Sequence, residues 1–573
     1  MRLTLAEFMH KKLHVMTLSS LVLVLVSGLL LFFIWRRSTK PTPGCGGEFD
    51  LLITGAEIID GSGGPPFRAD VGINNQRIAC IGNLATAKAR STIDANGLTL
   101  APGFIDVHTH VERNVSQTAP FEAPNFVRQG VTTVITGNCG RSFLDIGRFL
   151  KQLDANGTQV NLATLIGHNT VRLRVMKQNS AVPTAAQMNE MELLVNRGMR
   201  EGAFGLSTGL VYVPGTFSKT DEITRLAKVV AKEKGLYVSH IRDEGSRGVA
   251  ALEEAISIGE NAAVHVHISH FKAQGPNEWG SAQARLNLIR SARDRGFVVS
   301  LDQYPYRASS TGLAVLLPSW LSEGEFASAK RKLQDPIIRK QIRNDMLAQL
   351  KANGWNDYEF ARVAYYKFDL SLVGLNIAEI TKKREAESLA AHASLIPSKF
   401  ASEKRKGVSA TQSERQAETI MDLFSHGGAQ MVFFDMSEDD VETIMKNSEV
   451  MFGSDSSVRE ETSTVLPHPR GMGTFPRVLG VYVREKNLLT IEEAVRRMTS
   501  LPAATFGLTE RGLIRQNNWA DLVIFDRNKI LDTATFEKPL SQPEGIHYVI
   551  VNGALVLHQQ TLRRTFPGMA LRH

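Results

Sequence analysis

The chain contains 573 residues, of which 43% are hydrophobic and 22% charged, a composition typical of folded globular proteins that excludes wholesale disorder. Its length exceeds the roughly 150 residues usual for one simple domain. The net charge of +8 does not indicate nucleic-acid binding, because the densest basic runs lie in one polar stretch, at residues 382–384 and 404–406, and no nucleic-acid-binding motif accompanies them. We therefore expect no nucleic acid among the partners.

Residues 15–35 form an apolar run without charged side chains, close to the roughly 20 residues that cross a bilayer as a helix. Such a run is a membrane span or a signal sequence. It is longer than the roughly 7–15 apolar residues of a signal peptide and lacks a small-residue cleavage site, so we predict an N-terminal transmembrane helix. With a linker rich in Pro and Gly, this single-pass membrane anchor occupies residues 1–48. Balanced basic residues leave its orientation open.

The segments that follow the linker and end the chain share one style of sequence. Residues 49–100 and 512–573 contain short alternating apolar stretches separated by turn residues, which indicates small β-structures. Because the style is the same, we expect the two ends to fold together as one composite β-sandwich domain. Cys80 lies in one of these strands and is interpreted as a buried apolar residue, and the three cysteines of the chain predict no disulfide framework.

Between the two β-segments, at residues 101–511, eight apolar strand-like stretches alternate with segments of helical spacing. This pattern predicts an α/β fold of the (β/α)₈ TIM-like barrel type, with an open doubly wound sheet as the alternative. The barrel is favoured because nearly every strand begins apolar and ends in His, Cys, Asp or Ser, as expected when chemistry gathers at the C-terminal face. Residues from about 307 to 426 interrupt the alternation with charged, helix-forming sequence, which we interpret as an insertion over the barrel mouth.

The first barrel strand ends in two histidines separated by one residue, His108 and His110. Residues i and i+2 of a strand share a face, so both side chains point the same way and supply half of a tetrahedral zinc shell. A lone pair of this kind could also be two polar residues at a strand exit. Further candidate ligands end other predicted strands, and these are Cys139, His240, His270 and Asp455.

A second pair of histidines, His265 and His267, resembles the first pair in spacing. Both lie toward the start of their strand, with side-chain parity opposite to that of His270. We therefore assign them to packing or hydrogen bonding and not to a metal. Asp455 has two interpretations, because an aspartate at this position could cap the next helix or could bind a metal and shuttle protons.

The sequence resembles the amidohydrolase superfamily of metal-dependent hydrolases, and within it the D-aminoacylases (N-acyl-D-amino-acid deacylases). The resemblance covers nearly everything from Phe49 to the C-terminus. The matching stretches include GFIDVHTH, QGVTTVITGNCG, GHNTVRLRVM, GLYVSHIRDEG, ISHFK, SLDQYPY, GSDSS and HPRGMGTFPRVLG.

The resemblance implies a zinc-dependent enzyme, with one or two ions, that hydrolyses N-acyl-D-amino acids to a carboxylate and a free D-amino acid. Preference for the D form rests on the resemblance alone. The implied metal ligands are His108, His110, Cys139, His240, His270 and Asp455, with the cysteine in place of the carbamylated lysine of many relatives. Asp455 is also the implied catalytic group. The residues implied to hold the substrate carboxylate are Lys272, Tyr304 and Arg470.

Two other functions stay open at this point. A cyclic-amide hydrolase of the hydantoinase or dihydroorotase kind shares the histidines and the aspartate, although a carbamylated lysine would be expected there and Cys139 speaks against it. A catalytically inactive, membrane-tethered binding protein is the second alternative. The complete set of candidate ligands speaks against it, because loss of function would be expected to spoil at least one position.

Overall fold

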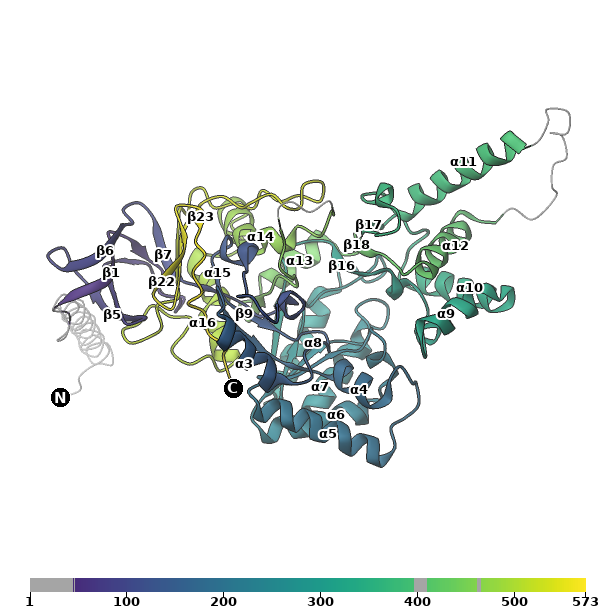
Figure 1. The fold of residues 1–573 in the computed structure, drawn as a ribbon, viewed down its shortest axis with the longest axis horizontal. Helices are drawn as coiled ribbons and strands as arrows, with labels where there is room; N and C mark the ends of the chain where they lie inside the picture. Colours follow the sequence, from purple (N-terminus) through teal and green to yellow (C-terminus); the bar gives the residue numbers. More distant parts are fainter. Residues whose placement is uncertain (1–44, 46, 396–409, 461–464) are drawn as a thin grey trace, which may run out of the picture.

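The computed structural model describes residues 45, 47–395, 410–460 and 465–573 (Figure 1). In this part of the chain, eight parallel strands follow one another in sequence order around the barrel, each paired with its neighbour. They are β8 (Phe104–Asp106), β9 (Val131–Thr136), β10 (Asn161–Thr164) with its continuation β11 (Ile166–Gly167), β12 (Gly205–Gly209), β13 (Leu236–His240), β14 (His265–Ile268), β15 (Val299–Gln303) and β19 (Val450–Phe452).

The ring closes between its first and last strands. Thr109, beyond β8, forms a parallel bridge with Ser456, beyond β19. The Asp455 amide donates to the His108 carbonyl at 2.8 Å, and the His110 amide donates to the Ser456 carbonyl at 2.8 Å. These contacts distinguish a closed barrel from an open doubly wound sheet.

Helices surround the strands because the strands are apolar on both faces and need cover on the outside. The larger ones are α3 (Ile146–Asn156), α4 (His168–Met176), α5 (Ala185–Arg200), α6 (Thr220–Lys232), α7 (Gly248–Ala262), α8 (Ala282–Asp294), α13 (Glu438–Met445), α14 (Arg470–Arg477) and α15 (Ile491–Met498). The other helical elements of the barrel are η1 (Val111–Asn114), α2 (Pro124–Val127), η2 (Gly215–Phe217), η6 (Val478–Glu485) and α16 (Ser500–Thr505).

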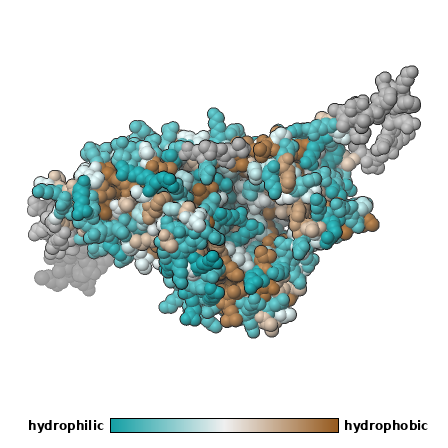
Figure 2. All heavy atoms as spheres, in the orientation of Figure 1, coloured by the Kyte–Doolittle hydropathy of each residue, from teal (hydrophilic) through white to brown (hydrophobic). Residues whose placement is uncertain are grey.

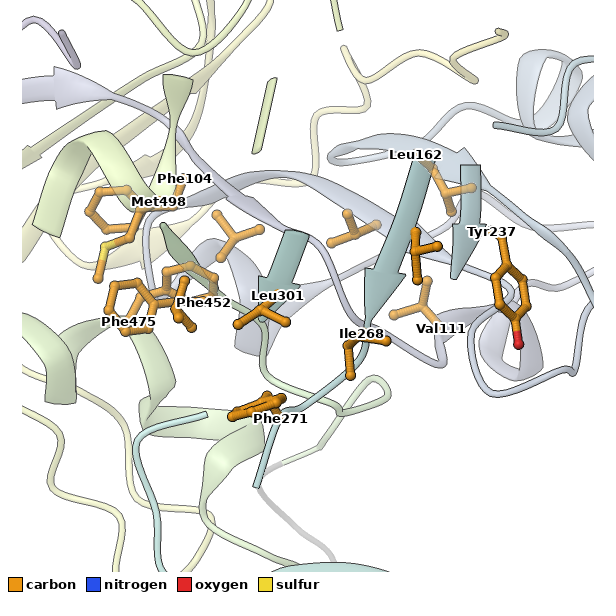
Figure 3. Close-up of a cluster of buried hydrophobic side chains, with 14 of the residues drawn as sticks. Phe104, Val111, Leu162, Tyr237, Ile268, Phe271, Leu301, Phe452, Phe475 and Met498 are labelled. Atoms are coloured by element: carbon orange, nitrogen blue, oxygen red, sulfur yellow. The ribbon is translucent and has the colours of Figure 1, made fainter. Parts of the chain in front are cut away.

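The core between strands and helices is continuous, and Figure 3 shows part of it, with Ile268, Leu301 and Phe452 of three strands. Phe104 of β8 stacks on Phe475 of α14 with ring centroids 5.6 Å apart. Hydrophilic side chains cover much of the outer face seen in Figure 2, with apolar groups between them. The barrel is therefore a packed scaffold that fixes where each strand ends.

Strands from both chain ends form two sheets beside the barrel. The first has the order β5-β4-β1-β6 and the second the order β23-β22-β21-β20-β7-β2-β3. Apolar side chains from both sheets, among them Ile53, Val71 and Ile524, pack together in one core. The bounds are β1 (Glu48–Thr54), β2 (Glu57–Ile58), β3 (Phe67–Arg68), β4 (Asp70–Asn74), β5 (Arg77–Gly82), β6 (Lys88–Asp94), β7 (Thr99–Pro102), β20 (Leu522–Phe525), β21 (Ile546–Val551), β22 (Ala554–His558) and β23 (Thr561–Leu562).

The prediction that no cysteines are paired is wrong. Cys45 and Cys80 form a disulfide with Cα atoms 5.4 Å apart, which leaves Cys139 as the free cysteine of the described residues. The error came from assigning Cys45 to a linker. In the structure Cys45 is half-buried against a small core that contains Phe49, Cys80 and Leu84.

The stretch that interrupts the alternation forms a unit with its own core, projecting from the barrel in Figure 1. Its antiparallel sheet has the order β16-β18-β17. Because β18 belongs to this sheet, the unit extends past residue 426 to Phe433. Its elements are β16 (Ser309–Gly312), η3 (Leu313–Leu316), η4 (Ser319–Ser322), α9 (Phe326–Gln334), α10 (Pro336–Ala352), β17 (Ala361–Tyr365), η5 (Leu370–Leu372), α11 (Ile377–Leu395), α12 (Gln412–Ser425) and β18 (Gln430–Phe433).

The prediction of an N-terminal transmembrane helix, and with it a membrane partner and membrane location, is corrected. Residues 15–35 lie outside the described part of the chain. Among the helices that the structure describes, none combines the length and the apolar character needed to cross a bilayer. The prediction rested on the apolar character and length of this run and on the absence of a cleavage site, all of them features of the sequence alone.

A buried polar network joins the β-sheets to the barrel at Asp521. Its carboxylate pairs with Arg511. It also accepts a hydrogen bond from the Asn161 side chain of β10 at 3.1 Å and one from the main-chain amide of Asn552 at 2.8 Å. All of these side chains are buried.

We expect Asp521→Ala to lower the free energy of unfolding by about 3–5 kcal/mol, because it leaves the buried Arg511 guanidinium without its counter-charge. Arg564→Ala is the control, since Arg564 pairs with Glu122 at 2.9 Å on the surface and should cost about 0–1 kcal/mol. Denaturant unfolding of both variants measures the difference. Equal losses would contradict a role for the network in joining the two parts.

Candidate metal centre

The six predicted ligands come from several strands of the barrel rim. His108 and His110 follow β8, and Cys139 follows β9. His240 is the last residue of β13, while His270 and Asp455 follow β14 and β19. Because all these strands are parallel, their C-terminal ends meet on one face of the barrel, and the structure brings all six side chains together there.

The backbone is unusual at half of these positions. Cys139, His270 and Asp455 have φ values of 51°, 35° and 48°, in the left-handed region that residues with a Cβ seldom adopt. Such conformations cost about 1–3 kcal/mol each and concentrate at functional sites, where the surrounding structure enforces them. The chain is bent at these points in a way that turns the side chains into the mouth.

The spacing of the donor atoms fits a zinc site. Cys139 Sγ lies 3.4 Å from His108 Nε2, 3.6 Å from His240 Nδ1 and 3.7 Å from His270 Nε2. A tetrahedral ion with ordinary zinc–sulfur and zinc–nitrogen bonds separates its ligands by about 3.5 Å. His110 Nε2 lies 3.1 Å from Asp455 Oδ1 and completes a second group with His108. The residues therefore fit one or two zinc ions.

The charges in the cluster also suit a cation. Burial opposes ionisation of the Cys139 thiol, but His108 and the neighbouring histidines hold its pKa well below the usual range. Burial likewise opposes ionisation of Asp455, but Arg470 and the neighbouring histidines together hold the pKa of that carboxyl well below the usual range. A thiolate and a carboxylate are the forms that bind zinc.

A second layer of polar side chains fixes the histidines, and the strand-end motifs did not predict it. Asp302 Oδ2 lies 3.5 Å from His108 Nδ1, and Asp302 Oδ1 accepts from the His270 amide at 2.9 Å. Glu244 Oε1 lies 3.0 Å from His270 Nδ1. Buried carboxylates of this kind orient ligand rings and raise their basicity. An acidic residue inside an apolar strand was the available signal for Asp302.

The second histidine pair lies outside the six-residue cluster. His265 Nε2 and His267 Nδ1 both lie within 2.9 Å of Ser300 Oγ. His267 Nε2 also lies 2.7 Å from Asp302 Oδ2. His267 thus supports the carboxylate behind His108, a contact that strand parity alone could not indicate.

The three residues predicted to hold a substrate carboxylate lie beside the cluster. Arg470 Nη2 lies 2.9 Å from Asp455 Oδ2, and its guanidinium covers the Tyr304 ring at 4.6 Å. Lys272 Nζ donates to Glu244 at 2.6 Å. The Tyr304 hydroxyl and Arg470 Nη1 are buried and have no hydrogen-bond partner among the described residues. Two unpaired buried donors at one place indicate a site for an acceptor group.

A pocket of about 910 Å³, including its opening to solvent, lies over the cluster. His240, His270 and Asp455 line one part of it. Residues of the inserted unit, among them Trp355 and Phe360, line another. A molecule bound in the pocket would contact both the candidate metal-binding residues and the inserted unit.

Comparison with known proteins agrees with this geometry. The model of the amidohydrolase family matches residues 91–557, and the chain belongs to this family. It is 34% identical to N-acyl-D-glutamate deacylase and 35% identical to D-aminoacylase, both of Alcaligenes xylosoxydans xylosoxydans. The two alignments cover 92% and 91% of this chain and 97% of each relative.

A solved structure gives the same result. The crystal structure of N-acyl-D-glutamate deacylase from Bordetella bronchiseptica with zinc and a phosphonate inhibitor is 33% identical, with a TM-score of 0.73. The match covers 92% of this chain and all of that one. L-hydantoinase from Arthrobacter aurescens is only 15% identical, with a TM-score of 0.50 over 92% of this chain and all of that one, and shares the fold alone.

We expect Cys139→Ala to lose zinc affinity by at least roughly 100-fold and to lose activity with it, because the sulfur lies close enough to a nitrogen of each of three histidines for all of them to bind one ion. Metal content per chain, measured by mass spectrometry after dialysis, checks this. His265→Ala is the matched control and should keep its metal, since His265 contacts Ser300 and not the cluster. Full zinc content in Cys139→Ala would show that the cysteine is not a ligand.

Proposed function

We propose that this chain is a zinc-dependent hydrolase of linear amides that cleaves N-acyl-D-amino acids into a carboxylate and a free D-amino acid. One observation carries the proposal. The cluster of thiolate, histidines and carboxylate lies beside two buried donors without partners among the described residues, the Tyr304 hydroxyl, which lines the same pocket as the cluster, and Arg470 Nη1, behind Asp455. The cluster suits metal-assisted attack on an amide, and the two donors suit the free carboxylate of an amino acid.

His108, His110, Cys139, His240, His270 and Asp455 are the residues that would hold one or two zinc ions. When bound, zinc supplies Lewis-acid chemistry, activating water at neutral pH and polarising the amide carbonyl. Behind the ligands, Asp302 and Glu244 hold the rings of His108 and His270 in place. The remaining steps belong to the protein's own side chains.

Substrate orientation falls to Arg470, Tyr304 and Lys272. The planar guanidinium of Arg470 has Nη1 free to donate, and the Tyr304 hydroxyl beneath it offers a second donor. Lys272 is held by Glu244 and adds positive charge. These groups would fix the α-carboxylate, which leaves the acyl amide as the part of the substrate that faces the metal ligands.

Proton transfer falls to Asp455. Its lowered pKa keeps it ionised at neutral pH, so it can accept a proton from the attacking water. Returning that proton to the departing nitrogen matters because amines leave poorly when unprotonated. Arg470 holds the Asp455 carboxylate at 2.9 Å and thereby positions the base as well as the substrate.

The proposal is tested by metal analysis of the purified protein together with hydrolysis assays on matched N-acetyl-D- and N-acetyl-L-amino acids. We expect bound zinc, release of free amino acid from the D forms, and loss of activity on chelation. Bound zinc with no turnover of any N-acyl amino acid would instead favour an inactive binding protein. Turnover of cyclic amides alone would favour the hydantoinase alternative.

Asp455→Asn should lower kcat by roughly 10²–10⁴-fold, the usual effect of losing a general acid–base group. Much of the zinc should stay, because the histidines and Cys139 remain. Turnover and metal content are measured on the same sample. Near-normal turnover with metal bound would show that Asp455 is not the proton shuttle.

Arg470→Ala should reduce kcat/KM for N-acetyl-D-amino acids far more than for the corresponding D-amino acid amides, which lack the carboxylate. A recognition site for one charged group, once removed, penalises only the substrates that carry that group. The ratio of kcat/KM for the acid to kcat/KM for the amide reports recognition of the carboxylate, because loss of the Arg470–Asp455 contact would affect both substrates alike. An equal loss for both substrates would assign Arg470 to the positioning of Asp455 alone.

A further inference from the structure

The wall that the inserted unit contributes to the pocket is mostly apolar and aromatic. Trp355 stacks on Phe360 with ring centroids 4.3 Å apart, and Phe360 lies near Phe433 at 6.2 Å. Leu316, Met346 and Leu350 line the same wall. Such surfaces favour apolar groups of a ligand, because binding removes both surfaces from water.

One carboxylate interrupts this wall. Asp435, just beyond β18, lines the pocket although it is only 6% exposed. Its Oδ2 accepts from Ser309 Oγ at 2.7 Å, and its Oδ1 is buried without a hydrogen-bond partner among the described residues. Its main-chain carbonyl accepts from the Gly275 amide at 2.8 Å and from Trp279 Nε1 at 3.1 Å. The backbone of Asp435 is therefore fixed.

Few groups around Asp435 could balance a second anion, because the two histidines that line the pocket, His240 and His270, belong to the set of metal ligands. Among the described residues that line the pocket, Lys272 is the one lysine and no arginine is present. Lys272 is already paired with Glu244 at 2.6 Å. A substrate with a carboxylate in its side chain would meet Asp435 and Glu244 in a desolvated space. Arg470 Nη1 is assigned to the α-carboxylate, so among the described residues that line the pocket no ammonium or guanidinium group is left to balance a second anion.

We propose that Asp435 is a specificity-determining residue, and that the preferred substrates are N-acyl-D-amino acids with large apolar side chains. On this proposal N-acyl-D-leucine, -methionine and -phenylalanine are accepted, whereas N-acyl-D-glutamate and -aspartate are rejected. The inference rests on the deacylase function proposed above and narrows its substrate class. Overall similarity does not decide the matter, because the chain resembles N-acyl-D-glutamate deacylase and D-aminoacylase to nearly the same degree.

The physical reason is repulsion between like charges in a space with little water. Burial raises the pKa of Asp435 to about 7, while Ser309 and Lys272 lower it, so a substantial share of the carboxyl is ionised at neutral pH. A second carboxylate beside it must overcome that charge or be taken up with an extra proton. A substrate with a neutral side chain is neither repelled by Asp435 nor required to take up a proton.

The test begins with the zinc-loaded full-length protein and N-acetyl derivatives of D-leucine, D-methionine, D-phenylalanine, D-glutamate and D-aspartate. We expect kcat/KM for the apolar substrates to exceed that for the two acidic ones by at least about 100-fold. Comparable or higher values for the acidic substrates would overturn the substrate class while leaving the deacylase function intact. Failure to hydrolyse any of the five would overturn the deacylase function itself.

Two variants test the role of Asp435. Asp435→Asn keeps the shape and can still bond Ser309, so we expect the acidic-to-apolar ratio of kcat/KM to rise by at least about 10-fold, chiefly through KM for the acidic substrates. Ser309→Ala is the matched control, because it removes the hydrogen bond but leaves the carboxylate, and should keep the acidic substrates rejected. A ratio unchanged in Asp435→Asn would show that Asp435 only anchors the inserted unit.

Discussion

The closure of the barrel between β8 and β19 is the constraint on which the rest of the site depends. Two backbone hydrogen bonds, from Asp455 to His108 and from His110 to Ser456, join the first strand to the last. They place the acidic residue of the last strand beside the histidine pair of the first. Cys139, His240 and His270 then complete the cluster, because the parallel strands between them end at the same height.

Much of this arrangement could be predicted from strand patterns. Residues at the ends of parallel barrel strands all face the mouth, however far apart they are in the sequence. His240 and Asp455 could therefore be assigned to one site because each follows an apolar strand-like stretch. His265 begins its strand whereas His270 lies beyond the strand end, and this difference in place separates the two histidines. Positions of this kind are set by local geometry that repeats from strand to strand.

The parts that escaped prediction depend on contacts between distant segments. Glu244 lies in a loop, and nothing in its local sequence indicates that it meets Lys272 and His270. Cys45 looked like part of a linker, yet it pairs with Cys80. The membrane helix was predicted from apolar composition at residues 15–35, outside the described residues, and the corrected fold is an amidohydrolase barrel with its associated β-sheets.

The sheet that combines early and late strands has a consequence for the order of folding. Strand β7 lies between β2, from the beginning of the chain, and β20, from near its end. During synthesis β7 can pair with β2 early, but its other edge stays unpaired until β20 has been made, near the end of the chain. An exposed strand edge of this kind can pair with another copy. Aggregation of nascent chains is consequently a hazard set by the connectivity of this fold.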